Sequence, residues 1–127
     1  MIRVQRIYDN PKGNNNENDF RVLVDRLWPR GLSKDTVKVD LWEKDIAPSN
    51  LLRKWFNHDE KKWNEFKQRY FKELDQKTEL VNLILRKQKE KPSSTTITLL
   101  YSTKEDKFNN AVALREYLEE KIKEHGR

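Results

Sequence analysis

The chain has 127 residues, a net charge of +6 at neutral pH and no cysteine. The absence of cysteine excludes disulfide bonds, thiolate metal sites and a cysteine nucleophile. The first residues lack the apolar run of a signal peptide, and no apolar stretch reaches the roughly 18 residues of a membrane span. We therefore expect a cytoplasmic protein without membrane contacts.

The first part of the chain predicts two strands with a loop between them. Alternating apolar residues indicate a short strand over residues 2–7. Residues 9–19 contain a proline, a glycine and several asparagines, a composition that predicts a flexible loop. The continuous apolar centre of residues 20–27 indicates a strand that is buried on both faces. The loop is long enough for the two strands to pair.

The middle of the chain predicts an irregular segment followed by three helices. Residues 28–48 contain turn-forming residues and no sustained periodicity. Ser49 is placed to cap a helix over residues 49–56. A second helix is expected to start near Asp59, because a stripe of apolar residues at helical spacing follows it. A third helix is expected over residues 78–90, capped by its first residue and either separate from the second helix or continuous with it.

The last part of the chain predicts a strand and then a helix. Residues 96–102 have the apolar, β-branched composition of a buried strand. The next helix begins after Asn109 or Asn110, because either side chain can cap it. We expect a short tail over residues 124–127.

These elements give the order β-β-α-α-α-β-α. The long helical connection lets the strands over residues 20–27 and 96–102 run parallel to each other. We therefore predict an α/β fold, a single domain over residues 1–127, in which a small sheet with at least one parallel strand pair is packed by about four helices.

The ends of these two strands carry the residues that suit a ligand. In open α/β sheets, ligands bind beyond the carboxyl ends of parallel strands. Arginine offers a planar fork that matches phosphate or carboxylate oxygens, and the N-terminus of the last helix favours anions. We therefore predict an anion-binding pocket formed by the groups at these strand ends: Arg26, Trp28, Arg30, Tyr101, Ser102 and Asn110.

If the pocket is catalytic, the acid or base candidates are Asp25, Asp45 and His58. Structural interpretations stay open beside these. Asp25 and Arg26 can pair with local charges, and Trp28 can pack in the core with its indole N–H on a backbone carbonyl. His58 can lie at a helix start or on the surface without any chemical role.

The motifs of common cofactor sites are missing. The chain has 3 glycines, too far apart for a glycine-rich nucleotide loop. Two separated histidines without cysteine give no transition-metal pattern. We therefore predict no metal site and no cofactor.

Several motifs together resemble the YeaO-like family of small bacterial proteins, classed as domain of unknown function 488. The resemblance rests on VLVDRLWPRG at residues 22–31 and on WEKDIAPS, LRKWFNHD, WNEFKQRY and LLYSTKEDKFNNAVAL further along the chain. It extends from about Phe20 to Tyr117. The resemblance implies a compact α/β fold and brings no established activity.

Three functions fit these residues. The first is a small-molecule site for an anion, either a binding site alone or an enzyme. The second is a nucleic-acid-binding module, because cations and aromatic residues alternate in a basic chain. The third is a structural or partner-binding protein without catalysis.

Overall fold

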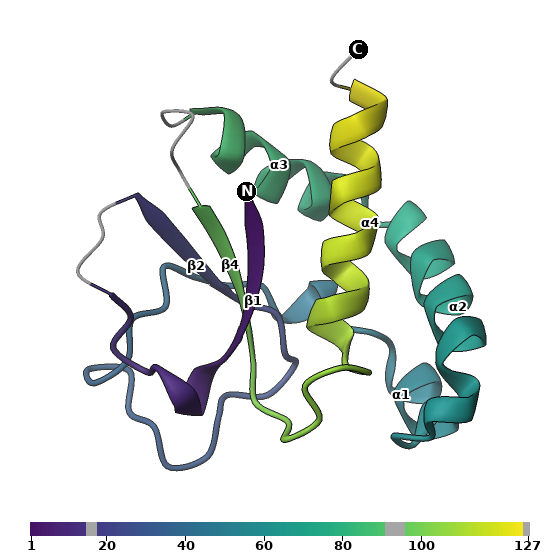
Figure 1. Ribbon diagram of the computed structural model, residues 1–127, viewed down its shortest axis with the longest axis horizontal. Helices are drawn as coiled ribbons and strands as arrows, with labels where there is room; N and C mark the ends of the chain where they lie inside the picture. Colours follow the sequence, from purple (N-terminus) through teal and green to yellow (C-terminus); the bar gives the residue numbers. More distant parts are fainter. Residues whose placement is uncertain (15–17, 91–95, 126–127) are drawn as a thin grey trace.

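A computed structural model of the chain describes residues 1–14, 18–90 and 96–125. Within these residues the strands are β1 (Ile2–Arg6), β2 (Asp19–Leu23), β3 (Leu41–Trp42) and β4 (Thr96–Tyr101). The helices are α1 (Asn50–Phe56), α2 (Trp63–Asp75), α3 (Thr78–Glu90) and α4 (Asn110–His125). The architecture confirms the predicted small α/β fold (Figure 1).

The strands form one parallel sheet in the order β1-β4-β2-β3. The predicted parallel pairing of the two long strands is confirmed, with Val22 opposite Leu99 in the register of β2 and β4. Their carboxyl ends therefore lie side by side at one edge of the sheet, where the sequence predicted a pocket.

The expectation that the first two strands pair with each other is wrong. β4 lies between them and hydrogen-bonds to both. Five of the six residues of β4 are buried, so the central place satisfies its backbone groups on both sides and keeps its side chains from water.

The strand predicted over residues 20–27 is shorter than expected. β2 ends at Leu23, because Asp25 turns out of the ladder and its carboxylate binds Ser102 at the end of β4. The segment predicted as irregular contains β3, which pairs with β2 through Leu41 and Trp42. A strand of two residues carries no periodic signal that a sequence could reveal.

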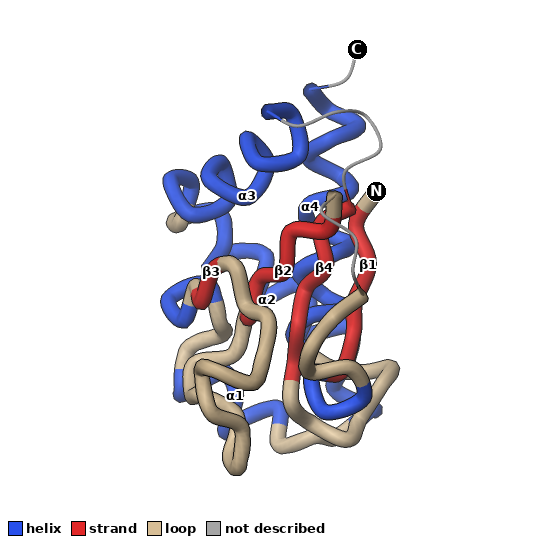
Figure 2. Tube along the Cα trace, turned by 90° about the vertical axis from the view of Figure 1, so that its left-hand side faces the viewer, coloured by secondary structure: helices blue, strands red, loops and turns tan. Residues whose placement is uncertain are grey.

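The two faces of the sheet are covered differently. The helices pack on one face, against the side chains of Val22, Ile97 and Leu99. On the other face, Leu23 and Leu100 form a small second core with Ile7. This core is covered by β3 and the connecting segments rather than by α-helices, and Figure 2 shows these segments in front of the strands. The covering side chains are those of Tyr8, Trp28, Leu32, Val39 and, from β3, Trp42.

The predicted helix caps agree with the structure in two cases. The Leu52 amide donates to Ser49 Oγ at 3.1 Å, and the Val112 amide donates to Asn109 Oδ1 at 3.0 Å. The third predicted cap is different, because α3 begins at Thr78 itself and Lys77 precedes it.

Three boundaries need comment. α2 and α3 are separate helices, interrupted at Gln76 and Lys77. α4 continues to His125, so residues 124 and 125 of the predicted tail are helical, and residues 126–127 lie outside the described residues. Of the predicted flexible loop over residues 9–19, Asp19 belongs to β2, and residues 15–17 lie outside the described residues.

Within the described chain, no helix combines the length and the apolar character that crossing a bilayer requires.

Candidate functional site

A cleft of about 650 Å³ lies beyond the carboxyl ends of β2 and β4. Its walls come from the chain after β2, from α1 with its flanking turns, and from the segment between β4 and α4. The sequence-predicted residues that line it are Asp25, Arg26, Trp28, Arg30, His58, Ser102 and Asn110.

Asp25 joins the ends of both strands to the start of α4. Its Oδ2 accepts hydrogen bonds from the Ser102 amide at 2.9 Å and from Ser102 Oγ at 2.7 Å. Its Oδ1 accepts from Asn110 Nδ2 at 3.3 Å. On its backbone side, the carbonyl oxygen accepts from Trp42 Nε1 at 2.8 Å.

The surroundings of Asp25 act on its pKa in opposite directions. Burial raises its pKa above the ordinary value of 3.8, and the hydrogen bonds from Ser102 and Asn110 only partly offset this. Raised carboxyl pKa values in clefts are a frequent mark of functional sites.

Arg26 has an unused hydrogen-bond donor at the same place. Its Nη2 donates to the carbonyl oxygens of Ala47 at 3.4 Å and Pro48 at 3.2 Å. Its Nε is buried and has no hydrogen-bond partner within the described residues. A buried donor without an acceptor is rare and costs about 1–3 kcal/mol, so it points to an acceptor that the described residues do not supply.

Two further guanidinium groups line the cleft. Arg30 is held by its backbone, because Tyr8 Oη donates to the Arg30 carbonyl oxygen at 2.7 Å. Arg53 lies in the last turn of α1. Both side chains are exposed, and neither makes a hydrogen bond or ion pair within residues 1–14, 18–90 and 96–125. Both are available to a ligand in the cleft.

Trp28 lies at the predicted cleft and also has the structural role that the sequence left open for it. It lines the cleft, and its Nε1 donates to the Leu32 carbonyl oxygen at 2.6 Å. Its ring packs edge-on against Trp42, with 5.4 Å between the ring centroids. The residue thus helps to hold the loop after β2 in shape.

His58 is displayed by an unusual backbone. Asn57 and His58 have φ angles of 48° and 56°, so both are left-handed. This conformation is uncommon for residues other than glycine, and asparagine tolerates it better than most. The His58 side chain is exposed and lines the cleft, while the neighbouring Asp59 caps the turn that follows. Packing of the His58 side chain therefore does not account for the strained backbone at this residue.

Two predicted residues lie elsewhere. Tyr101 is buried in the core beneath the helices, and Asp45 is exposed in a short 3-10 turn over Lys44–Ile46. Neither lines the cleft, and we leave both out of the site.

Sequence reasoning missed other lining residues. Arg53 and Asn50 are three residues apart on α1, a spacing that places them on one helix face, but only the tertiary structure turns that face to the cleft. Phe56 and Phe66 were missed because their helical spacing is typical of a core. Phe108 was missed because it lies in the polar segment between β4 and α4.

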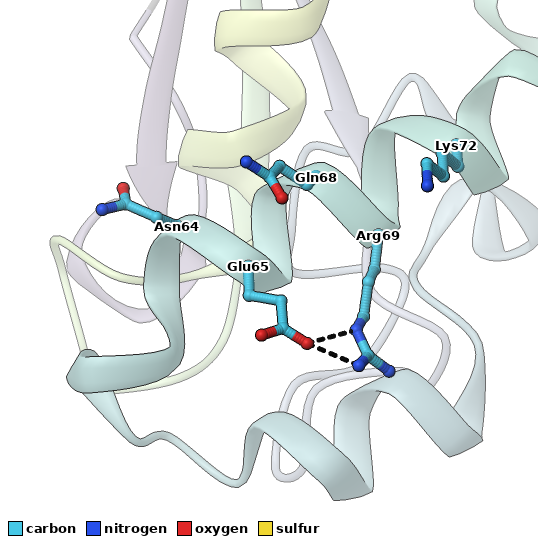
Figure 3. A pocket seen from close by; sticks show the side chains of 5 residues that line it. All are labelled: Asn64, Glu65, Gln68, Arg69 and Lys72. Carbon is cyan, nitrogen blue, oxygen red and sulfur yellow. Dashed lines mark hydrogen bonds and ion pairs between the residues drawn. The ribbon is translucent and has the colours of Figure 1, made fainter.

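A second hollow, of about 640 Å³, lies on the outer face of α2 (Figure 3). Asn64, Glu65, Gln68, Arg69 and Lys72 line it. All come from one exposed helix face, and Arg69 Nε donates to Glu65 Oε2 at 2.8 Å, so this arginine is already neutralised. Among the described residues, no group of His, Asp and Glu side chains gathers as metal ligands would.

Comparison with known proteins identifies the family of this chain. A family model described as the inactive DUF488-N3 subclade matches residues 1–127. The chain belongs to the YeaO-like DUF488 family. This confirms the resemblance found in the sequence motifs.

The relatives share most of the chain. The uncharacterized protein YeaO of Escherichia coli (strain K12) is 36% identical over 117 residues, which cover 92% of this chain and 96% of that protein. The uncharacterized proteins Rv3073c of Mycobacterium tuberculosis and Mb3100c of Mycobacterium bovis are each 42% identical over 82 residues, or 65% of this chain and 67% of theirs. No solved structure matches the chain significantly.

Proposed function

We propose that this DUF488 protein binds a small anionic molecule, through a phosphate or carboxylate group, in the cleft beyond β2 and β4. The observation that carries the proposal is the buried Nε of Arg26, which has no acceptor among the described residues. Because this atom has almost no accessible surface, the Arg26 side chain must shift for a ligand oxygen to accept from it, and the contact then removes the cost of leaving that donor unpaired.

Charge supports the same conclusion. Arg26, Arg30 and Arg53 line the cleft, against one acidic side chain, Asp25. Guanidinium forks bind phosphate and carboxylate oxygens in a bidentate manner. The first turn of α4 adds partial positive charge, since Asn109 and Asn110 at its start also line the cleft.

The proposal is for binding without catalysis. The matching family model is described as inactive. In addition, the carboxylate of Asp25 is engaged by Ser102 and Asn110, which suits a structural anchor better than a mobile proton carrier.

Isothermal titration tests the proposal, with inorganic phosphate, sugar phosphates, nucleotides and carboxylic acids as probes. We expect at least one probe to bind, and the Arg30→Ala variant to bind it at least tenfold more weakly, which corresponds to about 1.4 kcal/mol. Arg69→Ala is the matched control, since it removes the same charge from the outer face of α2 (Figure 3). Absence of binding by the wild type, or equal binding by Arg30→Ala, overturns the proposal.

The net charge of +6 favours nucleic acid as a second candidate partner. A gel-shift titration with a single-stranded oligonucleotide at several salt concentrations distinguishes it. Phosphate-backbone contacts require a steep loss of affinity with salt, and that loss must become shallower in Arg30→Ala if the cleft holds the strand.

A further inference from the structure

The charge of the cleft lining points to a dianion. Three guanidinium groups face the single carboxylate of Asp25, which leaves an excess of two positive charges when that carboxylate is ionised. Of the three, only Arg26 is committed to backbone carbonyls, through its Nη2. A monocarboxylate leaves this excess partly uncompensated, whereas a phosphomonoester carries nearly two negative charges at neutral pH.

The cleft is large enough for more than a phosphate group. Its volume of about 650 Å³ lies in the middle of the range for pockets that hold drug-sized organic ligands. Binding of phosphate by the arginines therefore leaves room for an organic part of the same molecule.

An aromatic side chain supplies a surface for that organic part. Phe56, Phe66 and Phe108 all line the cleft, but Phe56 and Phe66 are only 6% and 2% exposed, so the half-buried Phe108 offers the accessible ring. Phe108 contacts Trp63 edge-on with 5.4 Å between the centroids, which holds the Phe108 ring in place. A fixed ring favours a flat ligand group, because aromatic pairs gain free energy beyond the area they bury.

One amide is suited to a ring that carries heteroatoms. Asn50, at the start of α1, lines the cleft, and its exposed side chain makes no hydrogen bond within the described ranges. An amide offers a donor pair and an acceptor together, which is the pattern that pairs with the edge of a nucleobase.

We infer that the ligand of the cleft is a phosphomonoester attached to a flat heteroaromatic group, of the chemical class of the nucleoside monophosphates. This inference rests on the proposed anion-binding function and names its ligand class. The arginines bind the phosphate, and the phenylalanine side of the cleft accepts the ring.

Isothermal titration at fixed pH and ionic strength separates the contributions of the two parts. The probes are the four nucleoside 5′-monophosphates, ribose 5-phosphate, inorganic phosphate and the free nucleosides. We expect at least one nucleoside monophosphate to bind tenfold or more tightly than both ribose 5-phosphate and its own nucleoside.

Variants then assign each part of the ligand to its side of the cleft. Phe108→Ala is expected to abolish the tenfold advantage of the nucleotide and to leave ribose 5-phosphate binding unchanged, while Arg53→Ala weakens both. Phe108→Leu keeps an apolar side chain and removes only the ring, so it is the variant of choice if alanine unfolds the protein. Phe71→Ala is the aromatic control, because Phe71 packs on Tyr117 away from the cleft.

The experiment distinguishes a wrong ligand class from a wrong anion-binding function. If ribose 5-phosphate or a carboxylate binds in an Arg30-dependent manner and no nucleoside monophosphate binds more tightly, the ligand class is wrong and the anion-binding function stands. The ligand class is also wrong if a nucleoside monophosphate shows the tenfold advantage and Phe108→Leu retains it. If neither these probes nor the carboxylic acids named above bind the wild type, both proposals are overturned.

Discussion

The two ends of β2 carry the same pair of residue types and use them in opposite ways. At the amino end, Arg21 is 1% exposed, and its guanidinium donates to the carbonyl oxygens of Asn10 at 2.6 Å and Pro11 at 3.4 Å. The adjacent Asp19 accepts a hydrogen bond from Thr98 Oγ1 at 2.6 Å. At the carboxyl end, Arg26 keeps a buried donor unpaired beside a cleft.

The difference teaches that a buried charge is not in itself a sign of function. Among the described residues, Arg26 Nε is the one buried side-chain polar atom without a partner. The Asp19–Arg21 end is complete within the chain and stabilises it, whereas the Asp25–Arg26 end has hydrogen-bonding capacity left for another molecule.

The largest expected effect is the difference between the stability losses caused by replacing Arg21 and Arg26. Arg21→Met should lower the free energy of unfolding by about 3 kcal/mol, because it leaves the carbonyl oxygens of Asn10 and Pro11 without their donor and removes the cation near Asp19. Arg26→Met should cost about 1 kcal/mol, since it removes two long hydrogen bonds together with an unsatisfied donor. Urea unfolding at neutral pH measures both, and equal losses would break the comparison.

A smaller effect is the pH dependence that Asp25 gives to the free energy of unfolding. Because the pKa of Asp25 is raised in the folded protein, its contribution to stability is complete below the unfolded value near 3.8 and is lost as pH rises through the raised pKa. The loss is about 1.4 kcal/mol for each unit by which the pKa is raised. Asp25→Asn should remove this fall.

The measurement is the free energy of unfolding of wild type and Asp25→Asn between pH 4 and pH 8, with their difference plotted against pH. The stability advantage of the variant should grow as pH rises. Asp19→Asn is the matched control at the amino end of β2. Parallel profiles for wild type and Asp25→Asn would contradict the prediction.

The smallest effect concerns the strained turn at the edge of the cleft. His58→Gly should raise the free energy of unfolding by about 1 kcal/mol, because glycine adopts a left-handed backbone without the steric cost. Asn57→Gly should gain less, because asparagine already tolerates this conformation. Thermal unfolding measures both gains.

Ligand affinity is a second measurement that distinguishes the His58→Gly and Asn57→Gly variants. If the strain serves to present its side chain to a ligand, His58→Gly gains stability and loses affinity, whereas Asn57→Gly keeps its affinity. A His58→Gly variant that binds the ligand as tightly as the wild type removes His58 from the site.

The sequence was sufficient for the elements with strong periodicity and for the place of the cleft. The apolar runs of β2 and β4 and the helices between them predicted a parallel pair, and the rule for strand ends then placed Asp25, Arg26, Ser102 and Asn110 together. The parallel pair is confirmed, and these four residues lie together, because both depend on local pattern and on one topological rule; that they bind a ligand stays a prediction.

Other features depend on contacts between segments far apart in the chain. β3 is too short to have a period, and the position of β4 between β1 and β2 depends on which strand is most completely buried. Arg53 faces the cleft only because α1 packs against α2. Nothing in the local sequence distinguishes Arg26 from Arg21, since their difference lies in the carbonyls that each can reach.

The central strand of the sheet is also the last strand to leave the ribosome (Figure 1). Until residue 101 is available, β1 and β2 have no common neighbour, and both expose unpaired edges. Formation of the complete sheet must therefore wait until β4 is available, and such non-local pairing is intrinsically slow. The cleft, which needs the end of that same strand, cannot form before it.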